Sequence, residues 1–238
     1  MRLWSHAKRI SQNLIVLILI GAASANSQIV VPNFLEDLEG NFNNNIPWND
    51  EAPVRYQQVF AGSEVGALTA LYQIRFRQDE VWGEAFSGTI PDATIVLTSI
   101  AAGPGELSMV FSENLGVDAM VVYSGLLTLR SASTGGSPNE FDIRIDLQQT
   151  FDFDPSGEMN LLMDVTIPTG PALTTFDAES TSDDSVSRVY CWTVEECLTT
   201  DDAMIADSVG LVTMFLDQAI FRDFFESGDT SAWSETVP

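Results

Sequence analysis

The sequence predicts an all-β protein, an antiparallel two-sheet β-sandwich of jelly-roll type. Three observations support this prediction. Apolar residues recur mostly with a period of two, turn signals separate the short apolar runs, and no long stretch shows the 3.6-residue period of a helix. Many short strands at regular spacing are typical of sandwiches and jelly rolls.

Three runs alternate between apolar and polar side chains, and each is therefore expected as a half-buried antiparallel strand. The residues expected to point inward are, run by run, Leu68, Ala70, Tyr72, Ile74 and Phe76; then Phe141, Ile143, Ile145 and Leu147; then Leu161, Met163, Val165 and Ile167.

Other runs are apolar on both faces and are expected as central strands between packed layers: residues 94–100, 120–129 and 210–216. Shorter apolar segments complete the set of expected strands, at 55–60, 107–111 and 185–190. A short helix is expected somewhere within residues 193–208.

The beginning of the chain has the pattern of a Sec signal peptide. Basic residues precede a short apolar run at 14–21, and small residues then predict cleavage between Ala25 and Asn26. The apolar run is too short to span a bilayer, and no later stretch is apolar enough. We expect a secreted or cell-surface protein without a membrane span in the mature chain, divided into a signal peptide (1–25), an N-terminal extension (26–49), one β-sandwich domain (50–220) and a C-terminal tail (221–238).

The charge balance excludes several kinds of chemistry. The chain has 10 Lys and Arg, 34 Asp and Glu and a formal net charge of −24. Its one histidine, His6, and its one lysine, Lys8, lie in the expected leader, so the mature charge is 7 − 34 = −27. A mature chain without His or Lys has no Ser-His-Asp triad, no His-ligated zinc and no Schiff-base lysine. Its negative charge repels nucleic acid and anionic lipid.

Two cysteines remain, Cys191 and Cys197. An even number in an exported chain predicts a disulfide.

Five segments occur in a characteristic order: VVPNFLEDLEGNFNNNIPWN (30–49), RYQQVF (55–60), FDFDPSGEMNLLMDV (151–165), FDAESTSDDSVSRVY (176–190) and GLVTMF (210–215). Together they resemble a family of exported bacterial proteins of unknown function, many of which carry a PEP-CTERM sorting signal. The resemblance implies an exported β-rich domain and no catalytic residues.

The chain departs from the family at its end, which lacks a Pro-Glu-Pro motif. Residues 224–234 instead resemble a short tail found on unrelated exported bacterial proteins, which implies an address or processing tag. The alternative is an edge strand with Trp233 packed on the sandwich.

Two acidic segments are candidates for calcium, the one cofactor that the sequence suggests. The first contains Asp152, Asp154, Ser156 and Glu158, at spacings that resemble the start of a calcium loop. Met163 stands where that loop needs its last carboxylate, so a hairpin turn is the favoured interpretation. The second contains Asp177, Asp183 and Asp184, with a solvated loop as the favoured alternative.

Aromatic and charged residues outside these loops have ordinary structural explanations. Trp48, Trp82 and Trp192 could stack on sugar rings, but such tryptophans more often anchor loops to a core. Arg188 is expected in a structural ion pair. A pair of carboxylates could hydrolyse a glycoside, but with 34 acidic residues some pair always lies close by.

The leading functional hypothesis is a non-enzymatic β-sandwich, structural or adhesive, at the cell surface or in the extracellular matrix. Its expected partner is an extracellular polysaccharide or a cell-surface protein. Two alternatives remain: a calcium-dependent carbohydrate-binding module, and a glycoside hydrolase or lyase that uses carboxylates and arginine.

Overall fold

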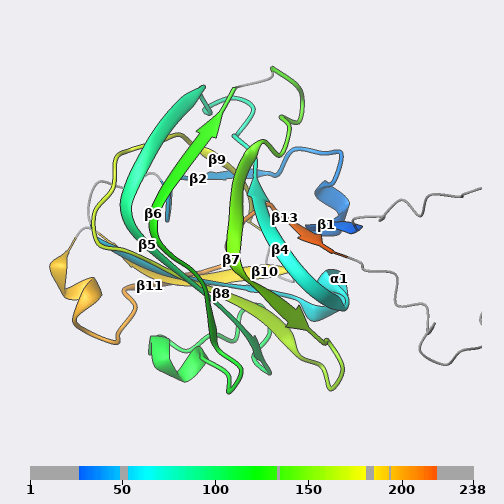
Figure 1. Cartoon of the computed structure of the whole chain (residues 1–238), viewed down its shortest axis with the longest axis vertical. Helices are drawn as coiled ribbons and strands as arrows, with labels where there is room; N and C mark the ends of the chain where they lie inside the picture. Colours follow the sequence, from blue (N-terminus) through cyan, green and yellow to red (C-terminus); the bar gives the residue numbers. More distant parts are fainter. Residues whose placement is uncertain (1–26, 49–52, 133–134, 181–184, 193, 219–238) are drawn as a thin grey trace, which may run out of the picture.

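The computed structural model describes residues 27–48, 53–132, 135–180, 185–192 and 194–218, and within them it is an all-β sandwich of antiparallel sheets (Figure 1). The sheet orders establish the sandwich, while the jelly-roll topology stays a prediction. The expected cleavage site at Ala25 and Asn26 and the tail from 221 lie outside these residues. No helix in the described ranges is long and apolar enough to cross a membrane.

The strands form one sheet of four, one of six and one of three. In spatial order, the first contains β1 (Ser27–Val31), β13 (Thr213–Asp217), β4 (Leu68–Phe76) and β7 (Ile143–Phe153); the second contains β11 (Ile205–Asp207), β10 (Val186–Trp192), β3 (Val54–Phe60), β8 (Asn160–Ile167), β5 (Phe86–Ile100) and β6 (Met120–Ser131); the third contains β12 (Val209–Leu211), β9 (Phe176–Ser180) and β2 (Phe42–Asn44). The short helices are α1 (Gly62–Val65) and the 3₁₀ turns η1 (Asn33–Leu35), η2 (Phe111–Asn114) and η3 (Glu195–Leu198). The segment expected as an extension thus contributes β1 and β2 to the sheets.

The two larger sheets pack face to face around one apolar core. The rings of Phe60 and Phe215 meet edge to face across the sheets, with centroids 5.0 Å apart. The residues expected to point inward at 160–167 are confirmed, because Leu161, Met163, Val165 and Ile167 all lie in this core, but the strand is not half-buried, since Leu162 and Asp164 on its other face are buried as well.

The alternation expected in β4 is wrong at Ala70 and Tyr72, whereas Leu68, Ile74 and Phe76 lie in the core as expected. Irregular pairing between Leu68 and Gln73 turns Leu71 into the core. Tyr72 packs instead against a second apolar cluster, which contains Val30 and Met214. A β-bulge adds one residue to a strand and so reverses the side-chain pattern beyond it. Phe141 likewise joins this second cluster and not the main core.

The DPSGE turn is not a hairpin. The strand before it, β7, pairs with β4, whereas the strand after it, β8, pairs with β3 and β5 in the other sheet. The turn therefore carries the chain from one sheet to the other.

Three further strand predictions need correction. Residues 107–111 form no strand beyond an isolated bridge from Val110 to Asp202, and η2 begins at Phe111. The run 210–216 is divided between β12 and β13. The run 94–100 is central, within β5, but 120–129 lies in β6 at the edge of its sheet.

The long β5–β6 ribbon bends and extends past its neighbours. Its pairing shifts around Pro91, where Ala93 lies opposite Gly125, and Gly125 has a φ of 119° that favours glycine. Only residues 94–100 of β5 pair with β8, so the earlier half of β5 pairs with β6 alone. Beyond the bend, this ribbon and β7 border an open groove.

The edges of the two large sheets meet where β6 lies beside β7 (Figure 1). The Gln148 side chain on β7 bridges them, because its amide donates to the carbonyl of Ser124 (3.0 Å) and accepts from the Ser124 N–H (3.1 Å). At this junction, hydrogen bonds from a side chain join β6 to β7 in place of the backbone hydrogen bonds of a continuous sheet.

Candidate functional site

The first candidate calcium loop forms the turn between β7 and β8. Asp152 is exposed on β7. Asp154 accepts a hydrogen bond from the Ser156 N–H (2.9 Å), which lowers the pKa of the Asp154 carboxyl. Glu158 has a φ of 63°, a left-handed conformation that turns the chain into β8. Among the described residues, no three His, Cys, Asp or Glu side chains are grouped so as to hold a metal ion.

The second candidate set is divided by the fold. Asp177 is buried in β9, where one carboxylate oxygen accepts from Arg77 Nε (2.7 Å) and the other from the Gly40 N–H (2.9 Å). Asp183 and Asp184 lie outside the described residues. Calcium binding therefore stays a prediction, with Asp177 already engaged in the fold.

Arg77 organises the segment between η1 and β2. Its guanidinium donates to the carbonyls of Leu35 (3.1 Å) and Leu38, in addition to the Asp177 carboxylate. Its side chain is only 1% exposed, and it lies over the Phe141 ring at 4.7 Å. One buried cation thereby holds several backbone oxygens that would otherwise lack a donor.

The acids around Arg77 titrate at unusually high pH. Burial raises the pKa of Asp177 to about 6, although Arg77 opposes the shift. Burial and then the nearby Asp177 carboxylate raise the pKa of Glu39 to about 7. Because these folded-state values exceed the ordinary values near 4, their ionisation disfavours the folded state.

Stability is therefore expected to fall between pH 5 and pH 8, as the folded protein loses protons that the unfolded chain has already released. The variant Glu39→Gln should show a weaker fall, because it removes the group with the highest of these pKa values. Thermal melts at both pH values test this, with the exposed neighbour variant Glu36→Gln as control. Identical pH dependence in Glu39→Gln and wild type would contradict the assignment.

The remaining candidates have structural roles for the most part. Arg188 forms the expected ion pair, with the carboxylate oxygens of Asp207 at 2.7 and 3.0 Å. Trp48 is buried against Phe76, with ring centroids 5.7 Å apart. Trp192 packs on Tyr190, while Trp82 is 66% exposed.

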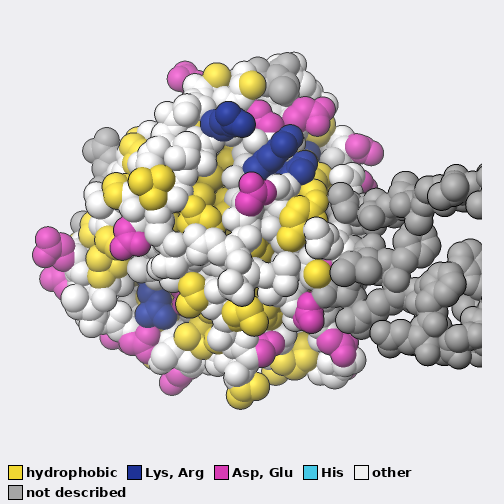
Figure 2. Space-filling model, in the orientation of Figure 1, with side chains coloured by type: hydrophobic (Ala, Val, Ile, Leu, Met, Phe, Trp, Pro, Cys, Tyr) yellow, Lys and Arg dark blue, Asp and Glu magenta, His cyan; other side chains and the backbone are white. Residues whose placement is uncertain are grey.

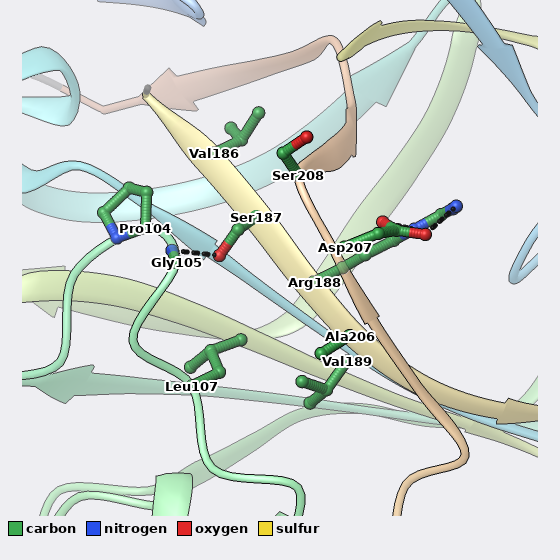
Figure 3. Close-up of a pocket in the computed structure, with 10 residues that line it drawn as sticks. All are labelled: Pro104, Gly105, Leu107, Val186, Ser187, Arg188, Val189, Ala206, Asp207 and Ser208. Carbon is green, nitrogen blue, oxygen red and sulfur yellow. Dashed lines mark hydrogen bonds and ion pairs between the residues drawn. The ribbon is translucent and has the colours of Figure 1, made fainter. Parts of the chain in front are cut away.

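A small cavity of about 170 Å³ beside β10 and β11 offers little chemistry. Figure 3 shows Arg188 and Asp207 engaged with each other on one side of β10. On the other side, the Ser187 hydroxyl accepts from the Gly105 N–H at 2.7 Å. The Arg188 Nε and Nη2 atoms and the Ser187 hydroxyl thus already have partners within the fold, whereas Arg188 Nη1 is buried without one.

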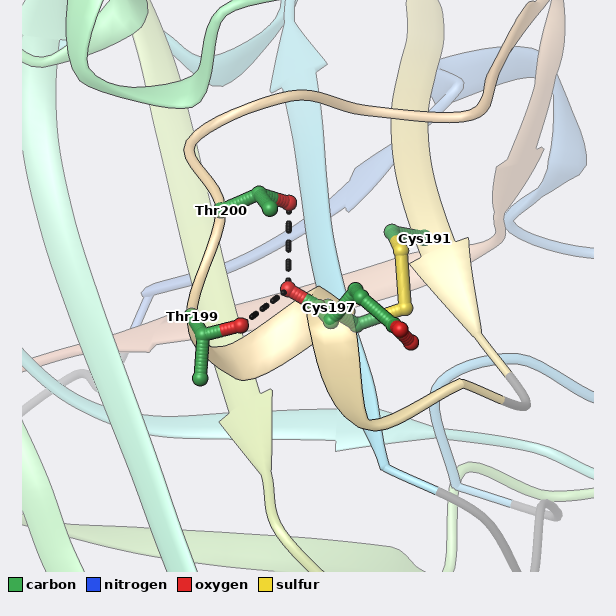
Figure 4. Close-up of a disulfide and its surroundings, with 5 residues drawn as sticks. Cys191, Cys197, Thr199 and Thr200 are labelled. Carbon is green, nitrogen blue, oxygen red and sulfur yellow. Dashed lines mark hydrogen bonds between the residues drawn. A yellow bond between two sulfur atoms is a disulfide. The ribbon is translucent and has the colours of Figure 1, made fainter.

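The predicted disulfide between Cys191 and Cys197 is confirmed. It joins β10 to η3 (Figure 4). The hydroxyls of Thr199 and Thr200 donate to the Glu196 carbonyl at 3.3 and 3.0 Å and close the end of this turn. The disulfide and these bonds fix a loop near the edge of the larger sheet.

A large depression lies on the face where β6 and β7 diverge, with a volume of about 920 Å³. A second depression of about 670 Å³ adjoins it and shares Asp142 and Arg144 with it; the two adjoining depressions are together called here the β6–β7 groove. The charged residues that line it are the arginines Arg75, Arg77, Arg130 and Arg144 and the acids Glu36, Asp37, Glu140, Asp142 and Asp146, and the uncharged polar residues include Gln73, Ser87 and Thr128.

Positive side chains gather over this part of the surface, above β4, β6 and β7 (Figure 2). Arg75 lies on β4, Arg130 near the end of β6, and Arg144 on β7. Arg130 and Arg144 are exposed, and Arg75 is half-buried. In a chain with a net charge of −24, this concentration of arginine is the site's distinguishing property.

The sequence alone gives no sign that these three arginines lie on one face. Residue 75 lies almost seventy positions before residue 144, and only the pairing of β4 with β7 places them opposite each other. The one signal in the sequence is that positive residues are rare in so acidic a chain, which makes the position of each arginine informative.

No protein-family profile, curated protein or solved structure matches this chain. The β6–β7 groove and its arginines are therefore the observations from which a function can be inferred.

Proposed function

We propose that the protein is an exported, non-enzymatic β-sandwich that acts as an adhesive component at the cell surface or in the extracellular matrix. In this proposal an extended extracellular polymer binds across the β6–β7 groove. The observation that carries it is the pair of adjoining depressions that make up this groove on one face of the sandwich.

The residues of the groove favour binding over turnover. The two carboxylates that line its larger part are each held by the fold, since Asp142 accepts from the Ala132 N–H (2.8 Å) and Asp146 accepts from the Gln73 amide. The other polar groups of the larger part are hydroxyls, the Gln73 amide and guanidinium groups, which recognise a ligand through hydrogen bonds and charge, while the smaller part adds the carboxylates of Glu36, Asp37 and Glu140. A groove open along strands also suits a chain-like ligand better than a small molecule, which is usually enclosed.

Filling the groove should abolish binding. Ser87 is exposed and lines the groove, so Ser87→Trp places a bulky ring there. We expect at least about a tenfold loss of affinity for any bound polymer, because a blocked contact costs at least about 1.4 kcal/mol. Binding of the purified exported protein to a panel of neutral and acidic polysaccharides measures this.

The matched control is Gln149→Trp, which places the same ring at an exposed position of β7 outside the groove lining. It should bind like wild type. Failure of wild type to bind every polymer of the panel, or equal losses in both variants, would refute the proposed function.

A further inference from the structure

The arginines of the structure fall into two groups. Arg55, Arg77 and Arg188 each form an ion pair with an aspartate. Arg75, Arg130 and Arg144 form none with any carboxylate of the described residues, and all three line the β6–β7 groove. Half of the described arginines thus lie unpaired on one face, although acidic residues outnumber basic ones more than threefold over the whole chain.

The arrangement works against stability. Arg75 and Arg144 lie directly opposite each other in the pairing of β4 with β7. Like charges in such a cross-strand pair repel. Burial and then the charge of Arg144 lower the pKa of Arg75. Packing does not require this pairing, since a neutral side chain at either position would remove the repulsion.

The groove also keeps its cations available. The Gln73 carbonyl oxygen accepts from Arg75 Nε, while the Gln73 amide donates to Asp146. Gln73 therefore binds Arg75 at one nitrogen, Nε, and donates to the neighbouring Asp146 carboxylate, which forms no ion pair with Arg75. The guanidinium groups of Arg130 and Arg144 form no hydrogen bond with the residues that the structure describes.

We infer that the β6–β7 groove selects acidic polysaccharides, through Arg75, Arg130 and Arg144 bound to their carboxylate or sulfate groups. This inference rests on the proposed function and adds the chemical class of the ligand. The guanidinium fork matches both oxyanions and binds them in a bidentate manner. The hydroxyls of Ser87 and Thr128 in the same groove provide partners for sugar hydroxyls.

A polysaccharide fits the charge of the chain better than nucleic acid. The formal net charge of −24 repels any polyanion at long range, and it repels the closely spaced phosphates of nucleic acid most. Acid groups carried one per sugar can meet three local arginines with less repulsion elsewhere. The protein is thus expected to recognise a pattern of charges at the groove and to gain nothing from its overall charge.

The test compares a polyuronate (alginate), a sulfated polymer (dextran sulfate), neutral dextran and single-stranded DNA as immobilised probes for the full exported chain. Wild type should bind alginate or dextran sulfate at least about tenfold more tightly than dextran. Arg130→Gln and Arg144→Gln should each weaken acidic-polymer binding roughly tenfold, and the double variant roughly a hundredfold. The variant Arg130→Lys with Arg144→Lys should bind with an affinity between those of wild type and the double Gln variant, because lysine keeps the positive charge but lacks the planar guanidinium group.

Two controls separate this result from charge and folding effects. Gln149→Glu with Val117→Glu lowers the net charge by two, as the double Gln variant does, at exposed positions outside the groove. It should retain most of the binding. The Arg144→Gln variant should melt at or above the wild-type temperature, because it relieves the repulsion with Arg75.

The outcomes also separate the inference from the proposed function. If Ser87→Trp abolishes binding while the double Gln variant matches the charge control, the groove binds polymer but the role of the arginines is wrong. If dextran binds as tightly as the acidic polymers, the chemical class is wrong. Arginine-dependent binding of DNA that is tighter than that of either acidic polysaccharide would overturn the assignment to polysaccharide.

Discussion

Replacing Arg77 by methionine is expected to lower the free energy of unfolding by about 3–5 kcal/mol, the largest effect of any single charge in the molecule. The side chains of Arg77 and Asp177 are only 1% and 0% exposed. Methionine would leave a buried carboxylate without its cation, and the carbonyls of Leu35 and Leu38 without their donor. Urea-induced unfolding at pH 8, where Asp177 is ionised, measures the loss.

A second substitution shows whether the unpaired charge causes this loss. Adding Asp177→Asn to Arg77→Met should recover part of the stability, because the buried position is then neutral and can still accept from Gly40. Arg130→Met, at an exposed position, is the control and should change stability by less than about 0.5 kcal/mol. A loss below about 1 kcal/mol in Arg77→Met would show that the ion pair matters little.

Removing the disulfide is the second large change. The variant Cys191→Ala with Cys197→Ala should lose about 2–3 kcal/mol, because the crosslink closes a short loop and limits the unfolded chain. Both sulfurs are also buried, in a small cluster with Phe111, Val189 and Ala203. Unfolding in denaturant, with wild type measured in oxidising and in reducing buffer, separates the contribution of the crosslink from that of sulfur packing.

The comparison with reduced wild type isolates the crosslink. Reduced protein keeps both sulfur atoms, so its loss reports the crosslink, and any further loss in the alanine variant reports packing in the cluster. Thr199→Ala, which removes only one hydrogen bond to Glu196, should cost about 1 kcal/mol or less. Equal stability of oxidised and reduced wild type would contradict the prediction.

The predictable part of the fold follows from local alternation. In the run 160–167 every second residue from Leu161 is apolar, so its inward residues and its strand were both predicted correctly, but the burial of Leu162 on the other face was not. In β4 the alternation in the sequence continues through the bulge, and only pairing with distant strands reveals the change of face. The DPSGE turn has the composition of a hairpin, but which sheet the next strand joins depends on contacts far along the chain.

The candidate site was harder to predict than the fold, because it depends more on contacts between residues far apart in the sequence. The disulfide and the ion pair of Arg188 were expected, since a cysteine pair and a cation among acids have few alternatives. The burial of Asp177 against Arg77 was missed, because the two residues lie a hundred positions apart. The arginine groove depends on the register of β4 against β7 and on the bend of the β5–β6 ribbon, and neither is encoded in any short segment.

The pairing of β1 with β13 has a consequence for the order of folding. Residues 27–31 have as their ladder partners residues 213–217, from the other end of the described chain. Contacts so distant in sequence form slowly, because a long loop must close before they contribute any stability. A nascent chain that ends before Thr213 leaves β1 without a neighbour and one edge of β4 open. The four-stranded sheet can therefore be completed only after residues 213–217 have been synthesised, and β1 remains unpaired until then.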